Sequence, residues 1–179
     1  ITVREMGATA SILSPRMFKS LVLPNLQALF GRIKSVPTVL HICGDTNPII
    51  EMMAQSGANA VSIDQMNRLP ESRAKLPNVV LLGNYKAFGE PFCEGTPEQV
   101  EALIKQSIEA GADGIWPGCD IWPQVPVENM HAMMGAMNLA LTANNIGLMW
   151  VGLEMATLVT ILMVGIYRTP SAIEAAWKY

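Results

Sequence analysis

Ser56-Gly-Ala-Asn-Ala-Val-Ser-Ile-Asp64 joins a glycine that ends a helix to a short apolar strand. Ala110-Gly-Ala-Asp-Gly114 repeats this helix–glycine–strand order further along the chain. Two more apolar runs, Val36-Pro-Thr-Val-Leu-His-Ile-Cys43 and Val79-Val-Leu-Leu-Gly83, are typical of strands of the same kind. Repeated helix–strand units imply parallel strands joined by crossover helices, so the sequence predicts an α/β fold.

Two segments between these strands have the pattern of helices. Residues 48–57 begin with a proline, which is tolerated in the first helical turn, and carry apolar residues on one side. Residues 97–110 have apolar side chains at helical spacing. Thr96 and Gln99 are placed as a capping box at the start of this second helix.

The N-terminal part of the chain adds further elements. Residues 15–34 predict a helix entered from Ser14, which Pro24 must kink or divide, and residues 2–8 predict one more strand. About five strand–helix units fit either an open doubly wound sheet or part of a (β/α)8 barrel, which needs about 250 residues when complete.

Composition excludes several classes of protein. The chain has 179 residues, a formal net charge of −3 and no long basic run, which argues against nucleic acid as a partner. Half of the residues are hydrophobic, which excludes a disordered chain. Three scattered cysteines are too few for a secreted disulfide scaffold, and no signal peptide opens the sequence, so we expect a cytoplasmic protein.

One group of residues has the chemistry of a metal site. His41 and Cys43 are two apart on a predicted strand and therefore point to the same face. Cys119 follows another strand, and the carboxyl ends of parallel strands meet at one edge. Two thiolates and one imidazole suit zinc and leave a fourth position open. The alternative is that these three side chains are ordinary packing residues.

Other polar residues at strand ends have less distinctive patterns. Asp64 and Asn84 could orient substrate or support the metal ligands, or could be turn and cap residues. Asp45 and Asp120, which closely follow candidate ligands, are interpreted as turn residues. Two further residues, Cys93 and His131, are interpreted as an incidental thiol and a packing residue.

Several stretches resemble the methylcobamide:coenzyme M methyltransferase family, which belongs to the uroporphyrinogen decarboxylase superfamily. They are Leu13-Ser-Pro-Arg-Met-Phe18, Thr38-Val-Leu-His-Ile-Cys-Gly-Asp45, Gly57-Ala-Asn-Ala-Val-Ser-Ile-Asp64, Leu82-Gly-Asn84 and Gly111-Ala-Asp-Gly-Ile-Trp-Pro-Gly-Cys-Asp120. Together they indicate that residues 1–138 form one domain that resembles this family, with the His-x-Cys and distant Cys pattern of its zinc-dependent branch.

The resemblance implies the C-terminal half of a (β/α)8 TIM barrel, with the earlier strands of the barrel expected upstream of Ile1. It implies zinc held by His41, Cys43 and Cys119, and transfer of a methyl group from a methylcobamide (corrinoid), carried by a partner corrinoid protein, to a thiol or tetrahydrofolate acceptor. A zinc-bound thiol is deprotonated, which suits it for attack on the methyl carbon. The rival interpretation is a uroporphyrinogen decarboxylase-like enzyme, which needs no metal.

Residues 139–179 differ in character from the rest of the chain. Residues 139–167 contain a single charged residue, Glu154, and residues 146–167 are long enough to span a membrane as an appended hydrophobic helix. Asn144-Asn-Ile-Gly-Leu-Met-Trp-Val-Gly-Leu-Glu154 and the end of the chain resemble antiporter-like membrane subunits of membrane-bound hydrogenase and respiratory complex I. The resemblance implies that Glu154 belongs to a proton path. The alternatives are a buried C-terminal helix, or an inactive, truncated methyltransferase fused to a membrane fragment.

Overall fold

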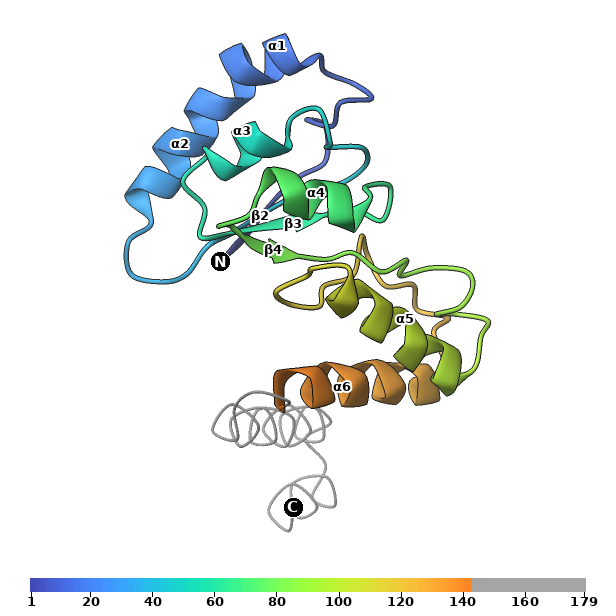
Figure 1. Cartoon of the computed structure of the whole chain (residues 1–179). Helices are drawn as coiled ribbons and strands as arrows, with labels where there is room; N and C mark the ends of the chain where they lie inside the picture. The colour runs from blue at the N-terminus through green and yellow to red at the C-terminus, as the bar shows by residue number, and fades with distance from the viewer. Residues whose placement is uncertain (143–179) are drawn as a thin grey trace, which may run out of the picture. The chain divides into compact units, whose positions relative to one another are not determined.

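The computed structural model describes residues 1–142, and the chain divides into two compact units, Ile1–Met134 and Gly135–Tyr179. In the described part of the first unit, four strands form one parallel sheet (Figure 1). The strands are β1 (Thr2–Glu5), β2 (Val39–Ile42), β3 (Ala60–Ile63) and β4 (Val80–Leu82).

The order of the strands in the sheet is their order in the sequence, β1-β2-β3-β4. A doubly wound sheet reverses its strand order at a switch point, whereas a (β/α)8 barrel adds each new strand beside the last. Of the two architectures that the sequence allows, the strand order therefore favours the barrel type.

The sheet continues beyond β4 through two isolated parallel bridges, which pair Leu82 with Gly114 and Tyr85 with Pro117. The segment around residues 114–116, expected as a strand, thus lies beside β4, but it forms isolated bridges and no continuous strand. Pro117 has no N–H to donate, and the following Gly118 N–H donates to the Tyr85 carbonyl at 2.9 Å instead. These contacts fix the segment that leads to Cys119.

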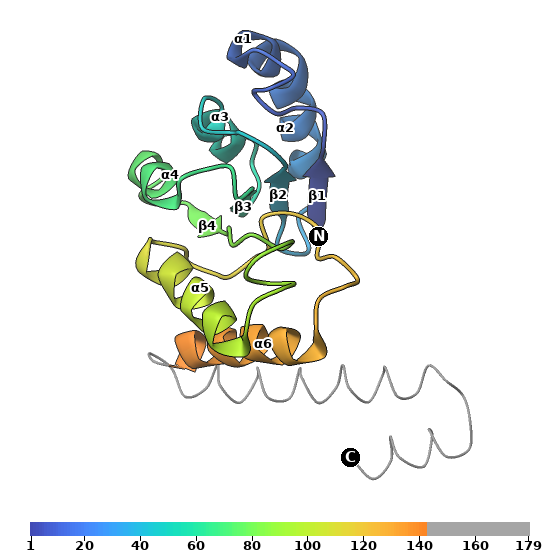
Figure 2. The same cartoon turned by 90° about the vertical axis from the view of Figure 1, so that its right-hand side faces the viewer.

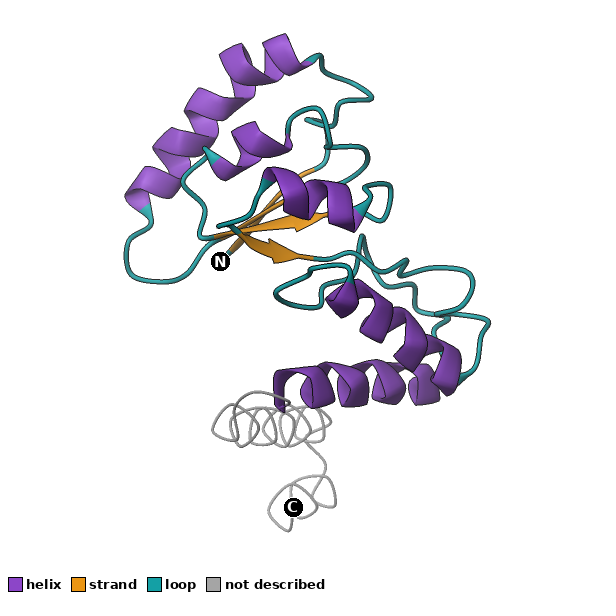
Figure 3. Ribbon diagram, viewed as in Figure 1, coloured by secondary structure: helices purple, strands orange, loops and turns teal. Residues whose placement is uncertain are grey.

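Helices connect the strands, and α2, α3 and α4 lie on one side of the sheet in both views (Figures 1 and 2). Loops join the helices to the strand ends (Figure 3). The helical elements are α1 (Pro15–Met17), the π-helix η1 (Phe18–Val22), α2 (Leu23–Arg32), α3 (Ile50–Ala54), α4 (Leu69–Lys75), α5 (Pro97–Glu109) and α6 (Val127–Thr142).

The helix predicted over residues 15–34 forms from Pro15 to Arg32 in three consecutive parts. Ser14 caps it, since its side chain accepts a hydrogen bond from the Met17 N–H at 3.2 Å. Pro24 does not interrupt the run. The π-helical turn η1 directly precedes the α2 segment that holds Pro24, and its wider winding makes room for the proline ring near the preceding turn.

The capping box predicted for α5 is confirmed. Thr96 Oγ1 accepts from the Gln99 N–H at 3.4 Å, and Gln99 Oε1 accepts from the Thr96 N–H at 2.8 Å. The short helix α4 was not predicted, because it has only seven residues and four of them are polar or charged. Its sequence lacks the apolar periodicity that identifies a helix.

The core lies between the sheet and the helices that cover it. Its largest fully buried side chains include Phe18, Leu40, Ile42, Ile50, Met53, Val61, Ile63 and Leu81. Strands β2 and β3 are buried along nearly their whole length, as expected of parallel strands covered on both faces.

The hydrophobic tail predicted for residues 139–179 lies almost entirely outside the described residues. Within residues 1–142, no helix is both long and apolar enough to cross a membrane.

Candidate metal centre

The candidate ligands lie where the parallel strands end. Cys43 directly follows β2, and Asp64 directly follows β3. In the β2–β3 ladder, His41 is paired in register with Ser62, and each of the two lies two residues before the strand-end residue, Cys43 or Asp64. The buried, apolar strands therefore carry their polar side chains to the same edge of the sheet, where the sequence predicted a site.

His41 is buried, with only 2% of its surface exposed, and both of its ring nitrogens have partners. Nδ1 lies 2.9 Å from Ser62 Oγ, and Nε2 lies 3.2 Å from Cys43 Sγ. Burial lowers the pKa of the imidazole, and the positive charge of Arg4 acts in the same direction. His41 is therefore held neutral, the form that binds metals, with Nε2 aimed at the thiol.

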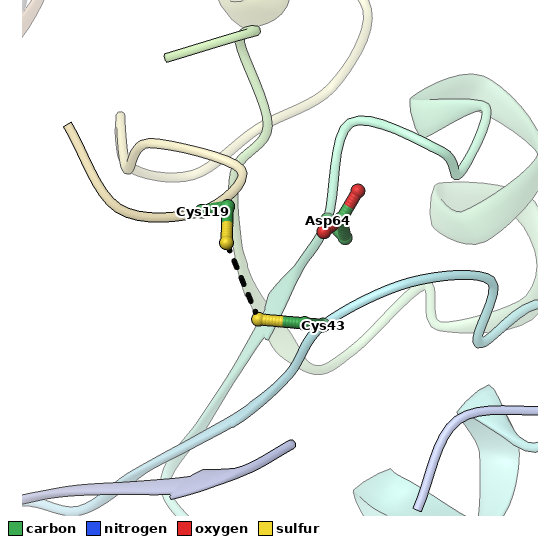
Figure 4. A group of neighbouring side chains, drawn as sticks. All are labelled: Cys43, Asp64 and Cys119. Carbon is green, nitrogen blue, oxygen red and sulfur yellow. Dashed lines mark hydrogen bonds between the residues drawn. The ribbon is translucent and has the colours of Figure 1, made fainter. Parts of the chain in front are cut away.

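The two cysteines predicted as ligands face each other across the site. Cys43 Sγ lies 3.5 Å from Cys119 Sγ, although the residues belong to different strand ends (Figure 4). Two sulfur atoms bound to one tetrahedral zinc at about 2.3 Å would lie about 3.8 Å apart. The observed separation thus suits a shared zinc ion with little movement.

Without a metal ion, Cys43 is held in its protonated form. Burial, and after it the neighbouring Cys119, raise the pKa of the Cys43 thiol to about 11. A metal cation would reverse this effect, because zinc binds the thiolate and displaces the proton. Binding of a metal cation at Cys43 would therefore release a proton.

Asp64 completes a cluster of possible ligands. One ligand atom each from Cys43, Asp64 and Cys119 lies within 4.8 Å of the others, in a group found among the described residues (Figure 4). Asp64 is only 3% exposed, and its Oδ1 accepts from the Met66 N–H at 2.9 Å. One oxygen of the carboxylate is thus engaged by the backbone of the following turn, but the carboxylate lies close enough to the two thiols to share a cation with them.

Asn84, predicted to bind substrate, holds the loops of the site. Its Nδ2 donates to the carbonyls of Asp64 and Asn67, at 3.1 and 2.7 Å. These contacts support the loop at Asp64, and a contact with substrate stays a prediction.

Asn67 contributes to the site and was not predicted. Its Oδ1 accepts from the backbone N–H and the hydroxyl of Thr46, at 2.9 and 3.1 Å. Its Nδ2 donates to the carbonyls of Gly44 and Asp64, at 3.1 and 3.0 Å. A side chain that is 4% exposed and fully hydrogen-bonded thereby joins the loop after Cys43 to the loop after β3.

Three more neighbours of the candidate ligands escaped the sequence prediction. They are Ser62 beside His41, Met6, whose Sδ lies 3.4 Å from Cys43 Sγ, and Arg4, which pairs with Asp120. Ser62 had a usable signal, because it is the single polar residue inside β3. Met6 and Arg4 could be placed only once β1 was known to lie beside β2.

Of the remaining predicted positions, some behave as expected and two do not. Asp45 is a turn residue, since its Oδ1 accepts from the Asn47 N–H at 3.0 Å. The interpretation of Asp120 as a turn residue was incomplete, because its carboxylate pairs with Arg4 Nη1 at 2.7 Å. The interpretation of His131 as a packing residue was wrong, since it is exposed on α6. Cys93 lies partly exposed in a loop.

Comparison with known proteins places this arrangement in a family. The family model for uroporphyrinogen decarboxylase matches residues 1–139. The chain belongs to the uroporphyrinogen decarboxylase family. The match covers the whole described sheet and every residue of the candidate metal centre, so the site lies within the family domain.

Within the family, the chain is similar to methyltransferases. It is 32% identical to a methylcobamide:CoM methyltransferase of Methanosarcina barkeri strain Fusaro over 140 residues, or 76% of this chain and 40% of that protein. A solved structure of a methyltransferase from Methanosarcina mazei superimposes with a TM-score of 0.71 at 28% identity, covering 77% of this chain and 41% of that one. The chain thus spans about 40% of the length of the methyltransferases it matches.

Two other similarities bear on the alternatives. A uroporphyrinogen decarboxylase of Nostoc punctiforme is 28% identical over 137 residues, or 72% of this chain and 37% of that protein. A hydrogenase-4 component F homolog of Methylacidiphilum infernorum is 69% identical over a short stretch of 49 residues, or 27% of this chain and 10% of that protein.

Proposed function

We propose that this chain is part of a zinc-dependent methyltransferase that transfers a methyl group from a methylated corrinoid, held by a partner corrinoid protein, to a thiol or tetrahydrofolate acceptor. The observation that carries the proposal is the position of Cys43 Sγ at the carboxyl edge of the sheet, 3.2 Å from His41 Nε2 and 3.5 Å from Cys119 Sγ. The group of ligand atoms that lie within 4.8 Å of one another is Cys43, Asp64 and Cys119, and His41 adjoins it through Cys43. The similarity to methylcobamide:CoM methyltransferases supports the same activity.

The donor set fits zinc in both chemistry and charge. Two thiolates and a neutral imidazole are preferred zinc ligands, and together they balance the double positive charge of the ion. Three protein ligands leave a position for the acceptor, and the nearby Asp64 carboxylate is a further oxygen donor. When bound, zinc would supply Lewis acidity that ionises an acceptor thiol at neutral pH.

The residues of the chain prepare this site in three ways. Ser62 fixes the orientation of the His41 ring and keeps Nε2 directed at Cys43. Asn67 and Asn84 hold the backbone around Cys43 and Asp64. His41 and Asp64 are nearly completely buried, so an acceptor would bind beside two side chains that are shielded from water.

Elemental analysis of the purified, reduced chain tests the proposal. We expect close to one zinc ion per chain, lost in Cys43→Ala and in Cys119→Ala. The matched control is Cys93→Ala, which removes a partly exposed cysteine outside the cluster and should keep the metal. Loss of methyl transfer from methylcobalamin to a small thiol or to tetrahydrofolate, in the same two variants only, would connect the metal to the reaction.

A decarboxylase is the second candidate, favoured by the similarity to the Nostoc punctiforme enzyme. Such an enzyme would need no metal at His41, Cys43 and Cys119. Purified wild-type protein that holds no zinc, and that gains none when zinc is added, would contradict the methyltransferase proposal and favour the decarboxylase.

The role of residues 139–179 is a separate proposal. Their low charge supports an origin in a membrane subunit, as a fusion or a truncated fragment, and a stretch of 49 residues of the chain matches a hydrogenase-4 component F homolog. Association with the membrane depends on this segment alone, whereas a cytoplasmic location is expected of residues 1–138. Partition of the full chain between membrane and aqueous fractions would distinguish the two.

A further inference from the structure

An ion pair joins the first strand of the sheet to the loop that carries Cys119. Arg4 Nη1 lies 2.7 Å from Asp120 Oδ1, and the Arg4 guanidinium lowers the pKa of that carboxyl. The two residues lie at nearly opposite ends of the family domain in the sequence. The contact therefore depends on the fold and is not a local turn.

Both members of the pair adjoin the candidate metal centre. Arg4 is paired in register with His41 in the β1–β2 ladder, and so lies beside one predicted ligand. Asp120 directly follows Cys119, another predicted ligand. The ion pair thus links the β1 side of the site to the residue next to the thiol.

Cys119 is anchored on its other side as well. The preceding residue, Gly118, donates its N–H to the Tyr85 carbonyl at 2.9 Å, just beyond β4. One neighbour of Cys119 is therefore attached beyond β4, and the other is attached to β1. These two attachments hold the segment in the position where Sγ lies 3.5 Å from Cys43 Sγ.

The solvent exposure of the ion pair indicates that it contributes little to the overall stability of the fold. The side chains of Arg4 and Asp120 are 42% and 69% exposed, and exposed ion pairs contribute little to folding. Their effect should therefore be felt by the loop they tether and not by the buried core.

We propose that Arg4 and Asp120 are positioning residues that hold Cys119 at the metal centre. The inference rests on the proposed zinc site, and the closing experiment distinguishes failure of the positioning role from failure of the proposed zinc site. Neither residue is a ligand in this proposal, since Arg4 carries no donor electron pair for a metal and Asp120 is engaged by Arg4.

Zinc affinity, measured by competition with a chromophoric chelator, tests the proposal in Arg4→Met, Asp120→Asn and the charge-exchanged double variant Arg4→Asp/Asp120→Arg. We expect each single variant to bind zinc about three- to fivefold more weakly, the scale of an exposed ion pair, and the double variant to recover most of the loss. The control is Arg68→Met, which removes the exposed Arg68–Glu71 pair and should leave zinc affinity unchanged.

The number of bound thiolates distinguishes positioning from simple charge. Arg4 repels a metal cation but also lowers the pKa of the Cys43 thiol, so its charge alone gives no single sign of change in zinc affinity. Cobalt substitution gives a second readout, because a displaced thiolate weakens the visible cobalt–thiolate absorption.

Three results are decisive. Weaker zinc binding in both single variants, with recovery in the double variant, supports the positioning role. Zinc binding in Arg4→Met that equals or exceeds the wild type overturns it. Absence of zinc binding in the wild type contradicts the proposed function itself, and with it the inference that rests on that function.

Discussion

Replacing Ser62 by alanine should weaken zinc binding without unfolding the protein. Ser62 is completely buried, and its hydroxyl lies 2.9 Å from His41 Nδ1. Alanine leaves this ring nitrogen buried without a partner, which costs about 1–3 kcal/mol. Since about 1.4 kcal/mol corresponds to a factor of ten, zinc affinity should fall about 10- to 100-fold, the range found when a partner of a metal-bound histidine is removed.

The assay is a competition titration with a chromophoric chelator, combined with chemical denaturation of the zinc-free protein. Ser107→Ala is the matched control, because Ser107 is also buried but donates to the Leu103 carbonyl within α5. Wild-type zinc affinity in Ser62→Ala would refute the idea that Ser62 orients the ring. A similar loss in Ser107→Ala would show that the effect is general to buried serines.

Further predictions concern pH, helix capping and the C-terminal segment. Burial lowers the pKa of His41 from 6.5, so the zinc-free protein should lose stability as the pH falls below 6.5, and His41→Gln should flatten this dependence in denaturation curves. The pKa of Cys43 is raised from 9.0 to about 11, so stability should also fall as the pH rises through this window, but not in Cys43→Ala. Thr96→Ala should destabilise the protein by about 1 kcal/mol in the same assay, because it removes the cap of α5, and no change would show that the box contributes nothing. Deleting residues 139–179 should improve solubility and keep the zinc; loss of the metal would show that the segment belongs to the fold.

The strands could be predicted because their signal is local. β2 and β3 are short, almost wholly apolar runs that end in His-x-Cys and in Asp, and each was predicted within a few residues. The same local pattern placed His41 and Cys43 on one face. Helix α5 was equally accessible, since its cap and its apolar periodicity agree.

The supporting contacts could not be predicted, because they depend on which strands become neighbours. Arg4 lies beside His41 only because β1 pairs with β2, and Asn67 reaches Gly44 only after two loops have folded together. His131 was misjudged for a related reason, since the sequence does not show that its side of α6 is exposed. Sequence spacing identifies the candidate ligands, but the residues that support them are known only once the neighbouring strands and loops are known.

The strand order has a consequence for how the metal centre assembles during folding. His41, Cys43, Ser62 and Asp64 all belong to one β–α–β unit, so closing a loop of about twenty residues brings them together. Cys119 lies 76 residues from Cys43, and its arrival requires a much longer loop to close. The entropic cost of loop closure grows only slowly with length, but non-local contacts form late. A nascent chain would therefore hold most of the donor set before the final thiolate arrives, and zinc capture would be completed by the last part of the sheet to fold.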